Sequence, residues 1–238
     1  MITSGVITGV DHHLEWMLPW WWKHYSKHSS YPVVFADFGM SKAAKAFCKE
    51  RGTLLPIKGS LLKTKASPQQ WEQIYGKVIW QSRSAWFKKP LALLASPFDY
   101  GLWLDIDCKV QKPLDPLFHS LHLGYEILIA TNPHVSPALE QGEVHYNSGV
   151  IAFCKKAPIL QQWIEIALSH SDKLPGDEEC LSRAVTLYKP RLLQLAQIFN
   201  WLHDFETSNP DTVICHYCGI NGKLKAINEL KESLSVQK

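Results

Sequence analysis

The stretch Gly101–Val110, GLWLDIDCKV, constrains the fold of this chain more than any other. An apolar run that ends at Leu104 precedes two aspartates, Asp105 and Asp107, which are separated by one residue. Such a run predicts a buried strand, and residues i and i+2 of a strand point to the same side. Two neighbouring buried carboxylates repel each other and are costly to bury unless a cation compensates. The stretch therefore predicts a site for Mg²⁺ or Mn²⁺, which prefer oxygen ligands, at the end of a strand.

A motif this short also occurs as two solvated aspartates in a turn, and that is the simpler interpretation of an isolated D-x-D pair. Two features favour the metal site here. The apolar run before Asp105 predicts a strand end, and further polar motifs that are described below accompany the pair along the chain.

Strand and helix patterns alternate over the first 60 residues. The apolar pattern predicts strands over 5–10, 32–36 and 54–57, and helices over 14–27 and 41–50. Ser41 is a typical N-cap for the second helix, and Gly52 is a typical stop. This β-α-β-α-β order predicts an α/β fold with a mostly parallel sheet that is flanked by helices.

The remaining elements are predicted to be shorter and more mixed. Strands are predicted over 108–111, 125–130, 150–153, 192–195 and 213–215, and helical segments over 77–95, 113–118, 177–187 and from 224. A loop and a short helix from Pro68 are expected within 58–76. Pro158 begins an amphipathic helix whose predicted apolar face comprises Ile159, Leu160, Trp163, Ile164, Ala167 and Leu168.

Composition excludes several classes of protein. A chain of 238 residues suits one domain, and a net charge of +3 is too small to indicate nucleic-acid binding. No run of about 18 apolar residues predicts a membrane-spanning helix, and the N-terminus lacks the charged and apolar regions of a signal peptide. The six scattered cysteines predict reduced thiols in a cytoplasmic protein. The pair Cys215-x-x-Cys218 alone falls short of the four ligands of a zinc site.

Four tryptophans fall in or beside the first predicted helix, at Trp16, Trp20, Trp21 and Trp22. We expect them to pack in the interior, because large aromatic side chains dominate protein cores. Contact with a membrane surface is the alternative, and it would make the protein peripheral to a membrane.

Five local patterns occur in an order that resembles the GT-A fold glycosyltransferases, most closely those of family 8. The patterns are Thr8-Gly9-Val10-Asp11, Trp103-Leu104-Asp105-Ile106-Asp107, Asn147-Ser148-Gly149-Val150, Asp177-Glu178-Glu179-Cys180-Leu181, and His216-x-x-Gly219 with a nearby lysine. The resemblance covers residues 5–223 and implies a single GT-A domain over 1–238. Its nucleotide-binding half would comprise about 1–110, and its acceptor and donor-sugar half about 111–238.

The resemblance implies a metal-dependent transferase that moves a hexose from a nucleotide-sugar to an acceptor, commonly with retention at the anomeric carbon. It favours UDP as the nucleotide and Mn²⁺ or Mg²⁺ as the cofactor. The acceptor stays open between a glycan, a lipid-linked sugar and a protein. The alternatives are a nucleotidyltransferase or nucleotide-sugar hydrolase with the same acidic pair, and a degenerate protein that binds a sugar-nucleotide without transferring it.

The resemblance also assigns roles to the nucleotide and metal side of the site. Asp105, Asp107 and His216 would be the metal ligands, and Asp105 would also contact the ribose. Asp11 would accept a hydrogen bond from the base, although a helix N-cap is the alternative for that residue. Gly219 completes the His-x-x-Gly pattern. Lys223 would neutralise the departing diphosphate, with Lys225 as a rival because the usual Pro-Trp after the lysine is missing.

A basic residue before the acidic strand often approaches the donor in this family, and the candidates are Arg83, Lys88 and Lys89, of which we favour the first two. On the sugar side, Asn147 would bind a sugar hydroxyl from a tight turn that Gly149 allows through a positive φ or a close backbone approach.

Two acids at the start of a predicted helix complete the sugar side. Asp177 would bind the donor sugar, and Glu178 stands where the family usually has a glutamine on the catalytic face. A carboxylate there could stabilise an oxocarbenium-like centre or act as a nucleophile, which leaves the stereochemical outcome open. Acids are also favoured in a first helical turn on dipole grounds alone.

Overall fold

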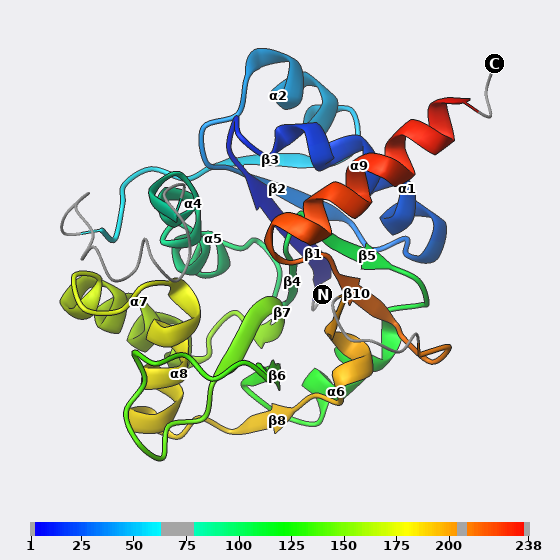
Figure 1. Ribbon diagram of the computed structural model, residues 1–238. Helices are drawn as coiled ribbons and strands as arrows, with labels where there is room; N and C mark the ends of the chain where they lie inside the picture. The colour runs from blue at the N-terminus through cyan, green and yellow to red at the C-terminus, as the bar shows by residue number, and fades with distance from the viewer. Residues whose placement is uncertain (1–2, 63–78, 204–208, 236–238) are drawn as a thin grey trace.

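The computed structural model describes residues 3–62, 79–203 and 209–235. Its central sheet has the strand order β3-β2-β1-β4-β7-β6-β8 (Figure 1). These strands are β1 (Ser4–Val10), β2 (Val33–Asp37), β3 (Thr53–Pro56), β4 (Tyr100–Leu104), β6 (Ile127–Thr131), β7 (Tyr146–Cys154) and β8 (Leu192–Gln194). All neighbouring pairs are parallel except those of β7, which runs antiparallel to both β4 and β6. The mostly parallel α/β sheet that the sequence predicts is confirmed.

Helices cover both faces of this sheet (Figure 1), and three further strands form a small second sheet. The helices are α1 (Leu18–His28), α2 (Lys42–Lys49), α4 (Ile79–Trp86), α5 (Lys89–Leu94), α6 (Asp115–His122), α7 (Pro158–His170), α8 (Asp177–Tyr188) and α9 (Gly219–Ser235), with short 3-10 turns η1 (Glu15–Met17) and η2 (Gln197–Phe199). The second sheet has the order β5-β10-β9, from Cys108–Val110, Ile214–His216 and Trp201–Leu202.

Buried side chains form one apolar cluster on each face of the sheet. Val6 and Leu102 point into the first cluster, whereas Ile7 and Trp103 point into the second, as the alternation of a strand requires. Helices α1 and α6 pack on the first face, and α5, α7 and α8 on the second. Strands buried on both faces read as continuous apolar runs, which is why the sequence pattern of β1 and β4 was easy to recognise.

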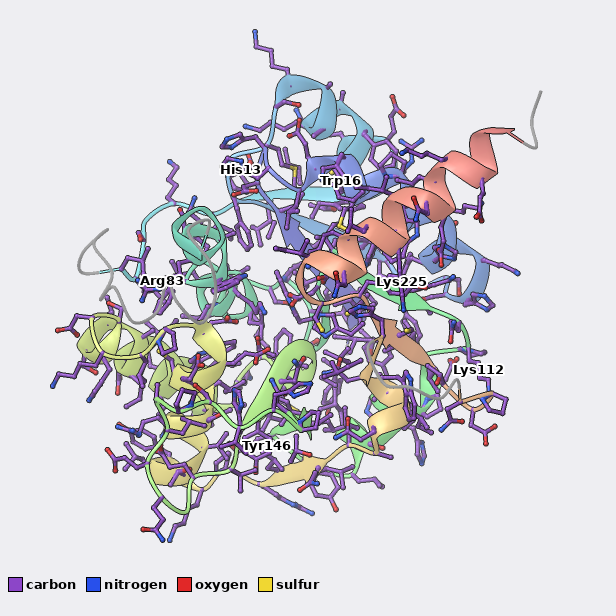
Figure 2. All side chains as sticks on the ribbon, in the orientation of Figure 1. His13, Trp16, Arg83, Lys112, Tyr146 and Lys225 are labelled. Carbon is purple, nitrogen blue, oxygen red and sulfur yellow. The ribbon has the colours of Figure 1, made fainter. Side chains whose placement is uncertain are left out.

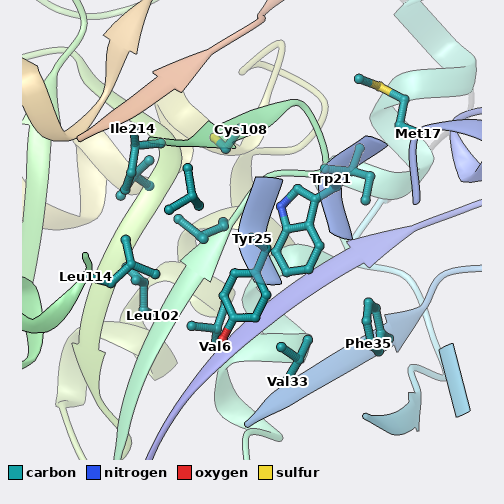
Figure 3. Packing of buried hydrophobic residues seen from close by; sticks show 14 of the residues in the cluster. Val6, Met17, Trp21, Tyr25, Val33, Phe35, Leu102, Cys108, Leu114 and Ile214 are labelled. Carbon is teal, nitrogen blue, oxygen red and sulfur yellow. The ribbon is translucent and has the colours of Figure 1, made fainter. Parts of the chain in front are cut away.

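The tryptophans of α1 belong to the first cluster (Figure 3). Trp20 and Trp21 are at most 1% exposed, and the Trp21 ring stacks on Tyr25 with 4.7 Å between centroids. Trp16 and Trp22 are half-buried against the same cluster. The prediction of internal packing is therefore confirmed. Among the described helices, none combines the length and the apolar character needed to cross a membrane.

Helix α7 begins at Pro158 as predicted, and five residues of the predicted apolar face are buried. Leu168 is the exception, with 46% of its surface exposed. It lies roughly 40° beyond Ile164 around the helix, outside the buried arc. The helix expected from Pro68 falls within 63–78, outside the described residues.

The last helix, α9, is longer and better anchored than the sequence predicts. It begins at Gly219 rather than near 224. The carboxylate of Glu229 accepts hydrogen bonds from Trp20 Nε1 (2.9 Å), Lys109 Nζ (2.8 Å) and the Tyr217 hydroxyl (2.7 Å). These bonds attach α9 to α1, β5 and the end of β10.

We predict that Glu229→Gln lowers the free energy of unfolding by about 1–2 kcal/mol at pH 7, because charge-assisted bonds are lost at a partly exposed site. Burial alone would raise the pKa of Glu229, but its hydrogen-bond donors, with His24 among them, hold that pKa well below its ordinary value. The stabilisation is therefore complete above about pH 4.5, the ordinary pKa, and is lost as the pH falls through the lowered one.

Urea unfolding of both proteins between pH 7 and pH 3 measures this difference. The matched control is Glu232→Gln, an exposed acid on the same helix, which should change the unfolding free energy by less than about 0.5 kcal/mol. A difference between wild type and Glu229→Gln that grows toward acid pH would contradict the assignment.

Candidate functional site

The two aspartates of the D-x-D motif stand in the turn between β4 and β5. The Cys108 N–H donates to the Asp105 carbonyl (2.9 Å) and closes this turn, so the aspartates lie just beyond the strand rather than in it. Their carboxylates nevertheless meet at one imidazole. His216 Nε2 lies 3.4 Å from Asp107 Oδ1 and 4.0 Å from Asp105 Oδ2. The three residues predicted as metal ligands are therefore brought together.

The chemistry of this set suits a divalent cation. Ligand atoms of Asp107, Cys108 and His216 all lie within 4.8 Å of one another. The Cys108 thiol is turned to the Gly149 carbonyl (3.5 Å), and burial raises its pKa well above the ordinary value, so it stays protonated and is a poor ligand. Burial alone would lower the pKa of His216, but Asp107 raises it above the ordinary value. Two carboxylates and the imidazole remain, and with the imidazole in its deprotonated form this donor set can bind Mn²⁺.

Gly149 makes room for the imidazole. It lies inside β7, so the predicted tight turn at Asn147-Ser148-Gly149 is wrong. The segment is extended because it continues a strand that is paired on both sides of it, through Tyr146 with Thr131 of β6 and through Val150 with Leu104 of β4. The φ of Gly149 is not positive. A Cβ at this position would come within 2.2 Å of His216 Cε1. Of the two roles expected for this glycine, close approach is the one observed.

A buried lysine connects the two sides of the site. Lys89 is 3% exposed, and its Nζ lies 3.0 Å from Asp105 Oδ1, 2.9 Å from Asp177 Oδ2 and 2.8 Å from Ser148 Oγ. Burial alone would lower the pKa of Lys89, but Asp105 and Asp177 raise it above the ordinary value. The ammonium group thus stays charged between two carboxylates.

The basic residues favoured from the sequence are directed elsewhere. Arg83 extends from α4 to the connection between α7 and α8 (Figure 2), where it donates to the carbonyls of Ser171, Leu174 and Pro175. Lys88 Nζ donates to the Phe38 carbonyl (2.7 Å). The choice of Arg83 and Lys88 over Lys89 is not supported by these contacts, because the rotation of α5 on the sheet decides which lysine enters the site.

The first turn of α8 supplies two acids. Asp177 Oδ2 also accepts from the Ser148 hydroxyl (2.8 Å), and burial raises the pKa of Asp177 to about 6 despite Lys89. Glu178 Oε1 accepts from the Ser148 N–H (3.1 Å), and Glu178 Oε2 accepts from Asn132 Nδ2 (3.0 Å). His145 Nε2 lies 3.5 Å from the same oxygen.

The surroundings of Glu178 favour a charged carboxylate. Burial alone would raise the pKa of Glu178, yet His145 and Lys89 lower it, and the same pairing raises the pKa of His145. Asn132 and His145 are functional candidates that the sequence reasoning missed. Their signal was weak, because both lie on the 132–145 loop, which no recognised motif covers.

Of the two rival lysines in α9, Lys223 reaches the acidic pair. Its Nζ donates to Asp107 Oδ2, whereas Lys225 Nζ donates to the His203 carbonyl (3.2 Å; Figure 2). Burial alone would raise the pKa of Asp107, but Lys223 and His216 hold it far below the ordinary value. Asp107 is therefore a carboxylate at neutral pH.

Two cavities of about 370 and 360 Å³ meet at the acidic pair. They share Trp86, Lys89, Asp105, Asp107 and Lys223 as lining residues. The first continues along Asn147, Asp177, Glu178, His216 and Gly219, and the second along Asp11, Phe38 and Trp103. A groove thus runs across the acidic pair, with different polar groups at its two ends.

Asp11 lies at the end of β1, and only 8% of its surface is exposed. Its Oδ1 accepts from the His13 N–H (3.0 Å) in the turn that follows the strand. The N-caps of η1 and α1 are Leu14 and Met17, so Asp11 does not cap these helices, which was the alternative. The residue lines the second cavity.

Solved structures provide an independent comparison. The chain is similar to the galactosyltransferase LgtC, solved with donor and acceptor sugar analogs, with a TM-score of 0.64 and 17% identity over 91% of this chain and 87% of that one. It is similar to mouse xyloside xylosyltransferase 1, with a TM-score of 0.59 and 12% identity over 93% and 99% of the two chains. For GlyE of Streptococcus pneumoniae the TM-score is 0.61 and the identity 17%, over 92% of this chain and 56% of that one.

These likenesses establish a GT-A type α/β fold. No protein-family model and no curated protein sequence matches the chain. The resemblance to GT-A glycosyltransferases is confirmed at the level of the fold, while the assignment to family 8 stays a prediction.

We predict that Lys89→Met lowers the free energy of unfolding by about 3 kcal/mol, because it leaves Asp105 and Asp177 close together without their shared cation. Urea unfolding at pH 7.5 in the presence of a chelator measures the change. The adjacent Lys88→Met is the matched control and should cost about 1 kcal/mol or less, since it removes one hydrogen bond. Equal losses in the two variants would show that Lys89 has no special structural role.

Proposed function

We propose that this protein is a metal-dependent glycosyltransferase that moves a hexose from a nucleotide-sugar, with UDP favoured, to an acceptor that is still to be identified. The main support for this proposal is that the side chains of Asp105, Asp107 and His216 converge where two cavities meet. A nucleotide-sugar has this layout: a base and a sugar at its ends, and a diphosphate between them. The glycosyltransferases with the same fold support the proposal, and LgtC was solved with donor and acceptor sugar analogs.

Asp105, Asp107 and His216 would hold Mn²⁺ or Mg²⁺. When bound, the ion supplies positive charge that neutralises a diphosphate leaving group. Lys223 adds an ammonium group beside Asp107, where it can meet the same negative charge. The preorganised charges of this chain thus favour departure of a nucleoside diphosphate.

The two cavities receive the two ends of the substrate. In the nucleotide-binding half, before about residue 110, Asp11 would accept a hydrogen bond from the base. Asn147 and Asp177 would bind the sugar in the half that follows, and Gly219 would contact the donor beside His216. Lys89 would hold Asp105 and Asp177 at a fixed separation between the two ends.

Glu178 would face the reacting carbon of the sugar. Two hydrogen-bond donors, the Ser148 N–H and Asn132 Nδ2, together with His145, surround its carboxylate. The negative charge is suited to stabilise an oxocarbenium-like centre or to attack it. Either role is compatible with retention at the anomeric carbon, which the resemblance implies. An LgtC variant in which an active-site glutamine is replaced by glutamate has the same fold as this chain.

We predict that UDP binding to the wild-type protein requires Mn²⁺ and that Asp107→Asn weakens it at least tenfold, because the amide removes one anionic ligand. Isothermal titration of UDP with and without Mn²⁺ measures both effects. Asp99→Asn, at the opposite end of β4, is the matched control and should bind as the wild type does. Failure of UDP, UDP-glucose and UDP-galactose to bind would reject the UDP assignment, and tight binding of GDP instead would change the nucleotide.

We predict that Glu178→Gln lowers turnover of the bound UDP-sugar at least tenfold and changes UDP affinity less than about threefold. The amide loses the charge, and its NH₂ group would face the donors of Asn132 or Ser148. Release of UDP from UDP-sugars with Mn²⁺ measures turnover, with and without candidate acceptors. Unchanged turnover would remove Glu178 from the mechanism.

The same assay separates the alternative functions. UDP release that is fast without any acceptor and does not respond to one indicates a nucleotide-sugar hydrolase. Metal-dependent binding without turnover indicates a degenerate sugar-nucleotide-binding protein.

A further inference from the structure

We propose that Asn200 is a positioning residue that fixes the tautomer and orientation of His216, so that the Nε2 lone pair of His216 is directed at the acidic pair. Sequence reasoning gave Asn200 no role. The inference rests on the proposed function, since it concerns the metal site that the function requires.

The donor and acceptor of each hydrogen bond around His216 can be assigned, starting from a backbone N–H, which can only donate. The Gly149 N–H points to the side-chain atom Oδ1 of Asn147 at 3.0 Å, which identifies that atom as the oxygen. The same oxygen lies 2.8 Å from the Asn200 amide, so Asn200 must present its NH₂ group there. The orientation of Asn200 therefore follows from the backbone of β7.

The other end of Asn200 faces the histidine. Asn200 Oδ1 lies 3.1 Å from His216 Nδ1. An amide oxygen can only accept, so Nδ1 must carry the proton. In the neutral imidazole Nε2 then has the free lone pair, and Nε2 is the atom that lies 3.4 Å from Asp107 Oδ1. The chain of hydrogen bonds from Gly149 through Asn147 and Asn200 thus leaves Nε2 as the nitrogen of His216 that can bind a metal.

Burial makes these hydrogen bonds difficult to replace. Asn147, Asn200 and His216 are 4%, 1% and 4% exposed, so water cannot readily replace a lost hydrogen bond. Gly149 confines the imidazole ring from one side. Asn200 itself is held between η2 and β9, and β9 pairs with β10 so that Leu202 lies opposite His216. The backbone therefore presents Asn200 to His216 without a flexible connection.

Partners of this kind orient metal-bound histidines in general, and their loss typically weakens metal binding 10–100-fold. We expect Asn200→Ala to weaken binding of Mn²⁺ by about that factor. Titration of the full chain with Mn²⁺, followed by the electron paramagnetic resonance signal of the free ion, measures affinity without nucleotide, acceptor or turnover.

Two further variants separate positioning from general destabilisation. Gln197→Ala removes bonds to Thr131 from the same 3-10 turn without touching His216, and it should bind Mn²⁺ as the wild type does. The pair His216→Ala and His216→Ala with Asn200→Ala should bind Mn²⁺ equally weakly, because Asn200 acts only through the imidazole.

A spectroscopic measurement needs no Asn200 variant. In the wild-type protein with ¹⁵N-labelled histidine and bound Zn²⁺ as a diamagnetic probe, His216 should show a proton on Nδ1 and the metal on Nε2. A proton on Nε2, or metal on Nδ1, would overturn the proposal.

The outcomes distinguish the two levels of inference. If wild type binds no Mn²⁺, the proposed metal site fails and the role of Asn200 fails with it. If wild type binds Mn²⁺ and His216→Ala weakens binding, but Asn200→Ala does not or Gln197→Ala weakens it equally, the metal site stands and the Asn200 proposal is overturned.

Discussion

The buried ammonium group of Lys89 is the interaction on which the rest of the site depends. A charge with 3% exposure is costly unless it is paired and hydrogen-bonded, and Lys89 meets that condition through Asp105, Asp177 and Ser148. These partners come from the end of β4, the start of α8 and the start of β7. One lysine thus fixes the relative position of elements that lie up to 88 residues apart, from 89 to 177.

The charges around Lys89 also explain why a cation suits this site. The carboxyl groups of Asp105, Asp107, Asp177, Glu178 and Glu179 line one cavity, together with the ammonium groups of Lys89 and Lys223. The acids outnumber the ammonium groups, and a divalent cation would offset part of the excess negative charge. Under the proposed function, the same cation would meet a diphosphate that spans the two cavities.

The sequence predicted the parts of the site that follow directly from strand and helix ends. Asp105 and Asp107 follow an apolar run, and Asp177 begins a recognisable helix, so their placement needs only local pattern. The choice among Arg83, Lys88 and Lys89 could not be made in this way. Neighbouring residues on a helix point about 100° apart, and only the packing of α4 and α5 in the folded chain selects one of the three.

Residues whose roles depend on contacts far along the chain also could not be predicted from the sequence. His145 and Asn132 meet Glu178 across more than 30 residues of chain, and Asn200 meets Asn147 across 53. Each looks like an ordinary loop residue in the sequence. Their roles arise from pairing in the folded sheet, which no local pattern records.

The antiparallel strand β7 is the feature that joins these contacts. Val150 of β7 pairs with Leu104 of β4, so the beginning of β7 lies beside the end of β4. If β7 ran parallel to β4, its beginning would lie at the opposite edge of the sheet. In the observed direction, Ser148 can reach Lys89 and Glu178 while Gly149 admits His216. One reversed strand therefore brings Ser148 and Gly149 to the acidic pair and His216, the proposed metal site.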